Sequence, residues 1–212
     1  MQLDCRTACN HAIGLYHGVF FDCWTACSGA ISALAEAGDL ILSDELNHAS
    51  LIDGCRLSRA DCVVYPHGDW QKVDLILQQK RQQYDRVWIV TNTVFGMDGR
   101  IAPIDRLQVI AQRHDASVIA DEAHGTGVFG NDGSGVCESL GVKDEIAIRI
   151  GTLSKAVGSQ GGFVAAPRVV VDHLINHCRP LIYSTSLTPA AVTVAAVGIR
   201  DIVSRPGRRE RV

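Results

Sequence analysis

The sequence predicts an α/β domain built on a mainly parallel central sheet. From about residue 30 onward, short apolar runs alternate with longer amphipathic segments. The short runs are apolar at consecutive positions, which is typical of strands covered on both faces, and the longer segments repeat apolar residues at helical spacing. Strands separated by helices in this way form parallel sheets, because a parallel neighbour needs a crossover connection.

Each predicted strand is a short apolar run that ends at polar or turn-forming residues. The first run ends at Ser43, the second at Pro66 and the fourth at Asp121. Polar and turn residues at these positions mark the ends of strands. In chain order, the predicted strands cover residues 39–42, 62–65, 87–90, 117–120, 146–150 and 162–166.

Two amphipathic segments between these runs predict helices. The apolar residues of the segment 71–83 are Val73, Leu75, Ile76 and Leu77. Those of the segment 104–114 lie on one stripe and are Leu107, Ile110 and Ala111. Ligands of such sheets bind beyond the carboxyl ends of the strands. Asp121 and the stretch 151–155 both follow strands directly, so the predicted architecture and the polar residues indicate the same edge of the sheet.

The composition excludes some classes of partner. The 212 residues carry a formal net charge of −3, which gives no reason to expect nucleic acid or an anionic membrane. No apolar stretch approaches the roughly 20 residues of a membrane span, and the first residues lack the pattern of a signal peptide. We therefore expect a cytoplasmic protein.

The eight cysteines raise the question of a metal site or of disulfides. Cys5 and Cys9 are four residues apart, as are Cys23 and Cys27, and two histidines lie between the pairs. A zinc cluster is conceivable there, but no turn residues shape either pair. We expect no bound metal and mainly free thiols that fill small core positions.

Asp121 opens the stretch Asp-Glu-Ala-His-Gly-Thr-Gly, directly after a predicted strand. A carboxylate in this place can pair with the protonated ring nitrogen of a pyridine cofactor and keep the ring an electron sink. An aspartate at a strand end also serves simply to cap the next turn. Both interpretations stay open on this residue alone.

Lys155 lies in the stretch Gly-Thr-Leu-Ser-Lys, which is followed by a glycine-rich segment. A lysine that forms a Schiff base is partly desolvated, so that its amine is available near neutral pH. Thr152 and Ser154 could bind a phosphate or orient the amine. A single loop lysine is more often a solvated charge, and the order of residues excludes a P-loop. His48, in Asn-His-Ala-Ser-Leu, could stack on an aromatic ring or simply cap a helix.

Together these stretches resemble the α-oxoamine synthases, which are fold-type I enzymes that use pyridoxal 5′-phosphate (PLP). The resemblance rests on residues 43–54, 121–128 and 151–155 and covers roughly residues 30–210. It implies the large domain of PLP fold type I. Glycine C-acetyltransferase, 5-aminolevulinate synthase and serine palmitoyltransferase share this core. Residues 158–162 and 174–186 are most similar to the members that act in biotin synthesis.

The resemblance implies a role for each motif residue. Lys155 would hold PLP as a Schiff base and move the α-proton of the substrate, and Asp121 would pair with the ring nitrogen. His124 would bind the ring hydroxyl, and His48 would stack on the ring. Two further residues would bind phosphate: Thr152 within the subunit, and Thr185, in a Ser-Thr pair that reaches the partner subunit of a homodimer.

The implied reaction is that of a PLP-dependent C-acyltransferase. L-alanine would condense with a pimeloyl thioester, carried by coenzyme A or acyl carrier protein, to give 8-amino-7-oxononanoate, carbon dioxide and the free thiol. Three alternatives remain open. One is a truncated, inactive remnant that binds at most PLP or a full-length partner. Another is a different α-oxoamine synthase, such as glycine C-acetyltransferase. The third is a different PLP reaction on the same fold, such as transamination.

The chain also departs from the family pattern. Gly96 stands where the family usually has a serine, and residues 22–27 lack the glycine of the phosphate loop. We expect residues 1–29 to be a poorly matching N-terminal segment, with 1 to about 28 read from a shifted frame or a wrong start. Residues 30–205 would form the PLP-binding domain, and residues 206–212 would begin a C-terminal small domain absent from the chain.

Overall fold

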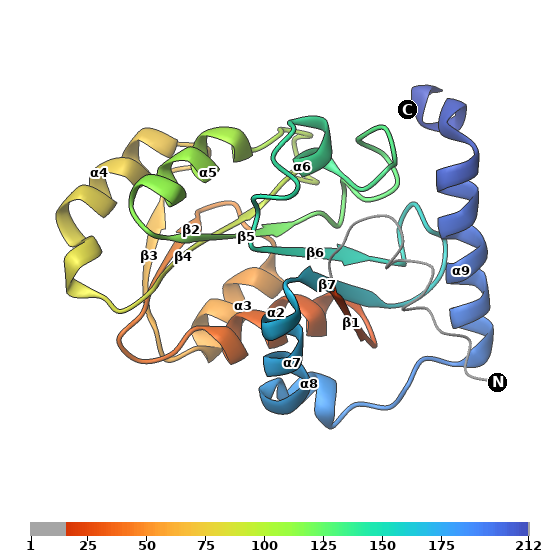
Figure 1. The fold of residues 1–212 in the computed structure, drawn as a ribbon, viewed down its shortest axis with the longest axis horizontal. Helices are drawn as coiled ribbons and strands as arrows, with labels where there is room; N and C mark the ends of the chain where they lie inside the picture. Colours follow the sequence, from red (N-terminus) through yellow and green to blue (C-terminus); the bar gives the residue numbers. More distant parts are fainter. Residues whose placement is uncertain (1–15, 212) are drawn as a thin grey trace.

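A computed structural model describes residues 16–211 and places them around one seven-stranded sheet (Figure 1). From one edge to the other, the strands are β1 (Tyr16–Phe20), β7 (Gly162–Ala166), β6 (Ile148–Thr152), β5 (Ser117–Asp121), β4 (Val87–Asn92), β2 (Leu40–Asp44) and β3 (Asp61–Tyr65). The pairings β2–β3, β2–β4, β4–β5 and β5–β6 are parallel, whereas β7 is antiparallel to both β6 and β1. This arrangement confirms the predicted α/β fold with a mainly parallel sheet.

All of the predicted strands are present, with bounds shifted by at most a few residues. The expectation that each is buried on both faces is wrong for β3, in which Cys62 and Val64 are exposed. The reason is the position of β3 at the edge of the sheet, where it has one neighbouring strand and little helical cover.

Helices cover both faces of the sheet (Figure 1). One face carries α4 (Trp70–Lys80) with the short 3-10 turn η1 (Arg81–Gln83), α5 (Ile104–Arg113) and α6 (Val136–Ser139). The other carries α2 (Cys23–Leu34), α3 (Ala49–Leu57), α7 (Arg168–His177) and α8 (Arg179–Ile182). The predicted helices 71–83 and 104–114 correspond to α4 with η1 and to α5. Among the described residues, no helix has both the length and the apolar character needed to cross a membrane.

The alternation of side chains along each strand divides the core into two layers. Leu40 and Leu42 pack with α4 and α5, whereas Ile41 between them packs with α2 and α3. Ile119 and its neighbours on β5 divide in the same way. Successive side chains of a strand point to opposite faces, so an unbroken apolar run supplies both layers at once.

The segment 16–34 forms two elements that the sequence pattern did not predict, β1 and α2. α2 begins with a capping box in which the Asp22 side chain accepts from the backbone N–H of Thr25 at 2.7 Å. A Cβ on Gly162 of β7 would lie 2.4 Å from the Asp22 carbonyl oxygen, so only glycine allows this close approach. The small residues of α2 and the short antiparallel β1 left no clear period, which is why the pattern missed them.

The last elements are α9 (Pro189–Ser204) and η2 (Pro206–Arg211), which follow a long connection after α8. In Figure 1, α9 stands along one side of the molecule, beyond the layers of helices that cover the sheet. It packs on the loop after β6 through Ala195, with Ile199 and Ile202 against Leu153 and Val157. α9 therefore supports the loop that carries Lys155.

Candidate active site

The carboxyl ends of β2, β4 and β5 and the loop after β6 surround one cavity of about 570 Å³. Of the predicted site residues, it brings together His48, Asp121, His124 and Lys155. Its other lining residues come from the start of α2, from the turn before α3 and its first residues, from the end of β4 and the loop after it, and from the turn after β5: Cys23, Trp24, Leu46, Asn47, Ala49, Ser50, Asn92, Phe95, Gly96, Met97, Asp98 and Ala123. Residues more than a hundred positions apart thus share one site.

Asp121 is the last residue of β5 and is almost fully buried. One carboxylate oxygen accepts from the backbone N–H of Ala123 at 2.8 Å, and the other accepts from the side-chain amide of Asn92 at 2.9 Å. Burial raises the pKa of the Asp121 carboxyl above its ordinary value, although the Ala123 N–H and the charge of Lys155 act in the opposite direction. Asp121 therefore caps the following turn and also presents a buried acid to the cavity.

Asn92 is a site residue that the sequence reasoning missed. It ends β4, donates to Asp121, and accepts from the backbone N–H of His48 at 2.8 Å. Its own N–H donates to the side chain of Asn47 at 3.0 Å, and the amide of Asn47 donates to the Val90 carbonyl at 2.8 Å. These bonds join the ends of β2, β4 and β5. The signal was the pair of polar residues, Thr91 and Asn92, that follows the apolar run 87–90.

His48 is the N-cap of α3, as the capping interpretation proposed. Its Nδ1 accepts from the Ser50 N–H at 3.3 Å and lies 2.7 Å from the Ser50 hydroxyl. The imidazole is exposed and contacts Trp24 edge-on, with ring centroids 5.8 Å apart. Capping thus fixes the backbone of His48 while its ring lines the cavity.

His124 is half-buried opposite Gly96. Burial lowers the pKa of His124, and the charges of Lys155 and His48 lower it further. A Cβ on residue 96 would lie 2.7 Å from His124 Nε2, so Gly96 leaves the space that this imidazole occupies. The glycine that departs from the family pattern therefore has a steric consequence here.

Lys155 lies on the loop after β6 and lines the cavity. Its side chain is exposed, so the partial desolvation expected from the sequence is absent in the single chain. The reason is its place on an open loop, where no described helix or strand covers the amine. Its charge nevertheless acts on both Asp121 and His124.

The two predicted phosphate residues lie outside this lining. Thr152 is buried at the end of β6, where its hydroxyl donates to the Gly161 carbonyl at 3.2 Å and lies 2.6 Å from the Ser154 hydroxyl. Thr185 is exposed on the connection between α8 and α9. A role for Thr185 toward a partner subunit stays a prediction.

The described cysteines, which start at Cys23, are all free thiols. Cys27, Cys55, Cys137 and Cys178 are buried, Cys23 is half-buried and Cys62 is exposed. Most of the described cysteines therefore fill small positions in the core, as expected. Cys5, Cys9 and His11 of the conceivable zinc cluster lie outside the described residues.

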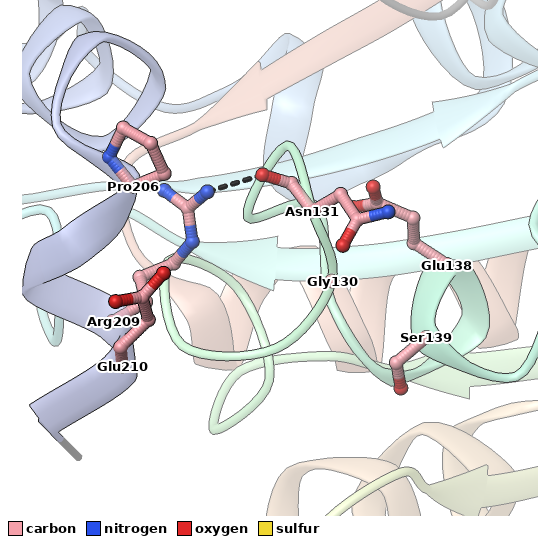
Figure 2. A pocket seen from close by; sticks show the side chains of 7 residues that line it. All are labelled: Gly130, Asn131, Glu138, Ser139, Pro206, Arg209 and Glu210. Atoms are coloured by element: carbon pink, nitrogen blue, oxygen red, sulfur yellow. Dashed lines mark hydrogen bonds between the residues drawn. The ribbon is translucent and has the colours of Figure 1, made fainter.

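A second cavity, of about 390 Å³, lies between η2 and the loop around residues 130–139 (Figure 2). Its main charged groups already have partners in the protein. Arg209 donates to the Asn131 carbonyl, and Glu138 accepts from the Ser134 N–H at 2.9 Å. The predicted cofactor residues, all of which the structure describes, lie elsewhere. We assign this second cavity a structural role.

Comparisons with known proteins indicate the same cofactor. Residues 18–202 match the family model of aminotransferase class I and II. An 8-amino-7-oxononanoate synthase from Lysinibacillus sphaericus is 45% identical over 195 residues, which is 92% of this chain and 50% of that protein. A serine palmitoyltransferase from S. paucimobilis with a bound PLP–myriocin aldimine has a TM-score of 0.92 at 34% identity, covering 97% of this chain and 52% of that one.

A crystal structure of 8-amino-7-oxononanoate synthase from Francisella tularensis is also similar, with a TM-score of 0.80 at 29% identity, covering 97% of this chain and 59% of that one. The chain spans about half the length of the curated relatives it matches. The likeness therefore concerns the part of those enzymes that contains the sheet and the cavity described above.

Proposed function

Because this chain belongs to the aminotransferase class I and II family, whose solved neighbours hold PLP, we propose that it forms the cofactor-binding half of an α-oxoamine synthase. Such an enzyme condenses an amino acid with an acyl thioester. The observation that carries the proposal is the convergence of Asp121 and Lys155, from the ends of neighbouring strands, on one cavity.

The residues of the cavity fit the ring of PLP. Asp121 is a buried acid, and burial raises its pKa because it disfavours the charged carboxylate. A cationic pyridine nitrogen beside Asp121 would stabilise the carboxylate. His124 faces the same cavity, with its pKa lowered by burial, so it can hydrogen-bond a ring hydroxyl as a neutral imidazole. The exposed ring of His48 can stack on the face of the cofactor.

We assign the remaining roles on the same basis. Lys155 Nζ would be the point of covalent attachment and would take and return the proton at the α-carbon of the amino acid. Thr152 would bind the phosphate, and Thr185 would reach the phosphate of a partner subunit in a homodimer. When bound, PLP supplies an electron sink that stabilises negative charge at that α-carbon. Asp121 would maintain the sink by keeping its ring nitrogen protonated.

We propose L-alanine and a pimeloyl thioester, on coenzyme A or acyl carrier protein, as the substrates, with 8-amino-7-oxononanoate as the product. The named relatives support this choice. The exposed apolar side chains of Trp24, Leu46 and Met97 at the cavity also favour an acyl chain. We also propose a role in biotin synthesis and a cytoplasmic location.

A second candidate is a chain that binds PLP without turnover. The exposed side chain of Lys155 favours it, because a Schiff-base lysine in an active site is expected to be partly desolvated. Turnover of L-alanine with pimeloyl thioester by the purified chain would contradict this second candidate and support the first. Transamination activity in its place would contradict both.

The cofactor site is tested by covalent trapping. The purified chain is incubated with PLP, reduced with borohydride and digested, and the modified lysine is located by mass spectrometry. We expect the label on Lys155 and its loss in Lys155→Ala. The matched control is Lys72→Ala, which removes an exposed lysine from α4 and should keep the label. Labelling spread over surface lysines in both variants would overturn the assignment.

A further inference from the structure

Beside the cavity lies a group of three metal-binding side chains, and two of them, the thiols of Cys23 and Cys27, have no role in the proposed function. Cys23 and Cys27 are one turn apart on α2, and their sulfurs are 4.0 Å from each other. Cys27 Sγ lies 3.8 Å from Asp121 Oδ2, and the three ligand atoms all lie within 4.8 Å of one another. Residues i and i+4 of a helix share one face, so α2 presents both thiols to the end of β5.

These separations are close to those of a tetrahedral zinc site. With Zn–S near 2.3 Å and Zn–O near 2.0 Å, tetrahedral angles place two sulfurs about 3.8 Å apart and a sulfur and an oxygen about 3.5 Å apart. The distances of 4.0 Å and 3.8 Å in the protein exceed these by a few tenths of an ångström. The third pair, Cys23 Sγ and the Asp121 oxygen, lies within 4.8 Å, so rotation of the Cys23 side chain would have to close that separation.

The site also has support, access and charge balance. The Asn92 amide donates to Asp121 Oδ2 at 2.9 Å, which orients the carboxylate as an outer partner of a metal ligand does. Cys27 and Asp121 are buried, whereas Cys23 is half-buried and lines the cavity, so an ion can enter from that side. Two thiolates and a carboxylate carry more negative charge than a divalent cation neutralises. The positive charge of the nearby Lys155 offsets the remaining negative charge.

We propose that Cys23, Cys27 and Asp121 bind a thiophilic divalent cation, Zn²⁺, with its fourth coordination position open to the cavity. Thiolate ligands select zinc over magnesium or calcium, which prefer oxygen. Three protein ligands and one open position form a site that also accepts water or a ligand atom from the cavity.

Two consequences follow from the identity of the ligands. Cysteine binds a metal ion as the thiolate, so the metal must displace the thiol protons of Cys23 and Cys27. Its affinity therefore increases with pH. Asp121 is also the proposed partner of the PLP ring, so Zn²⁺ and PLP should compete. This second consequence rests on the proposed function, whereas metal binding itself does not.

The test uses Co²⁺ as a spectroscopic probe, with the full chain kept reduced by a phosphine. We expect a single equivalent of Co²⁺ to give thiolate-to-metal charge transfer and the visible bands of tetrahedral cobalt, and Zn²⁺ to displace it. X-ray absorption of the Zn²⁺ form should show two sulfur neighbours. An octahedral spectrum, or zinc without sulfur neighbours, would overturn the proposal whether or not any variant folds.

Variants then locate the ligands. Cys23→Ser changes a half-buried residue and should preserve the fold, as checked by circular dichroism, while lowering Co²⁺ affinity at least about a hundredfold. Asp121→Asn should also weaken binding. Matched controls are Cys62→Ser, at an exposed thiol, and the double variant Cys5→Ser/Cys9→Ser. If the spectrum survives Cys23→Ser but disappears in the double variant, the proposed site is wrong.

Competition with the cofactor separates this proposal from the proposed function. If Zn²⁺ binds with two sulfur neighbours and also reduces the trapping of PLP on Lys155, both stand. If Zn²⁺ binds in this way but PLP is never trapped, the metal site stands and the cofactor proposal fails. If PLP is trapped on Lys155 and no sulfur-bound metal forms, the cofactor proposal stands and the metal site fails.

Discussion

At the scale of the residue, Asp121 shows how one side chain serves structure and chemistry together. Its Oδ1 caps the turn after β5, and its Oδ2 receives the Asn92 amide and faces the Cys27 thiol. The Ala123 N–H, the Asn92 amide and the Cys27 thiol all donate to the Asp121 carboxylate, yet burial still raises the pKa of Asp121. A buried acid in this condition is strongly stabilised by any cation that enters the cavity, whether a ring nitrogen or a metal ion.

His124 gives a prediction on the charge of Lys155. Burial lowers the pKa of His124 first, and the charge of Lys155 lowers it further, because a protonated imidazole beside an ammonium is disfavoured. We therefore expect the pKa of His124 to rise in Lys155→Met. NMR titration of the imidazole resonances measures it. In the control Lys72→Met, on a distant helix, the pKa should stay unchanged, and an unchanged value in Lys155→Met would contradict the prediction.

Arg149 gives a second prediction at this scale. It is 3% exposed on β6, and no described group accepts from its Nε or Nη2. Burial lowers its pKa, which reflects the unfavourable free energy of a guanidinium held away from water. We expect Arg149→Met to raise the free energy of unfolding by about 1 kcal/mol or more, since an apolar side chain of similar length removes this cost.

Urea denaturation measures this change. Arg56→Met is the control, because its guanidinium is exposed and its bond to Asp53, at 3.4 Å, is a surface ion pair. It should change stability by less than about 0.5 kcal/mol. A clear loss of stability in Arg149→Met would show that the guanidinium has partners worth more than its desolvation cost.

At the scale of the element, α2 decides the chemistry of one wall of the cavity. It supplies Cys23 and Trp24 to the lining, and the side chain of Asp22, the residue before Cys23, caps the helix. The resemblance to the α-oxoamine synthases implies that the phosphate of PLP would bind near residues 22–27. A helix N-terminus attracts anions, but a carboxylate at the cap neutralises that attraction. Asp22 is therefore expected to stabilise the helix and to oppose the phosphate.

The variant Asp22→Ser separates these two effects. Serine caps helices about as well as aspartate, so the free energy of unfolding should change little. Removal of the negative charge should tighten PLP binding about fivefold, equivalent to about 1 kcal/mol. Fluorescence titration measures the affinity. Asp69→Ser, at the N-cap of the distant α4, is the matched control and should leave PLP affinity unchanged. Equal affinities in the natural chain and in Asp22→Ser would place the phosphate elsewhere.

At the scale of the whole molecule, apolar side chains gather at the mouth of the cavity. Trp24, Leu46 and Met97 all line it, and each is exposed, Met97 completely. An apolar rim around a site is typical of a surface that another chain covers. The sequence resemblance implies a homodimer, and this rim is one place where the described residues would favour contact with a second copy.

We therefore expect the purified chain to associate as its concentration rises and to have low solubility. Sedimentation velocity over a range of concentrations measures the association. Met97→Ser should weaken it at least about tenfold, since burial of a methionine contributes about 1.5–3 kcal/mol. Val169→Ser, at an exposed position of α7, should have little effect. A monodisperse monomer at all concentrations would contradict the expectation.

The sequence by itself determined six of the seven described strands and the motif residues of the site. Apolar runs such as 87–90 and 117–120 must lie between two layers of helices, because no other environment buries both of their faces. Asp121, Lys155 and His48 were identified because each occurs in a specific stretch near the end of such a run. Their convergence was implied because parallel strands end at the same edge of a sheet.

Only the tertiary structure decided which distant residues complete the site. Asn92 connects His48 to Asp121, and Cys27 reaches Asp121 across 94 positions of sequence. Neither contact has a local signature, since each depends on how α2 and β4 pack beside β5. The exposure of Lys155 and the burial of Arg149 were undetermined for the same reason. Burial depends on the helices and strands that pack around a side chain. The residues next to it in the sequence do not determine it.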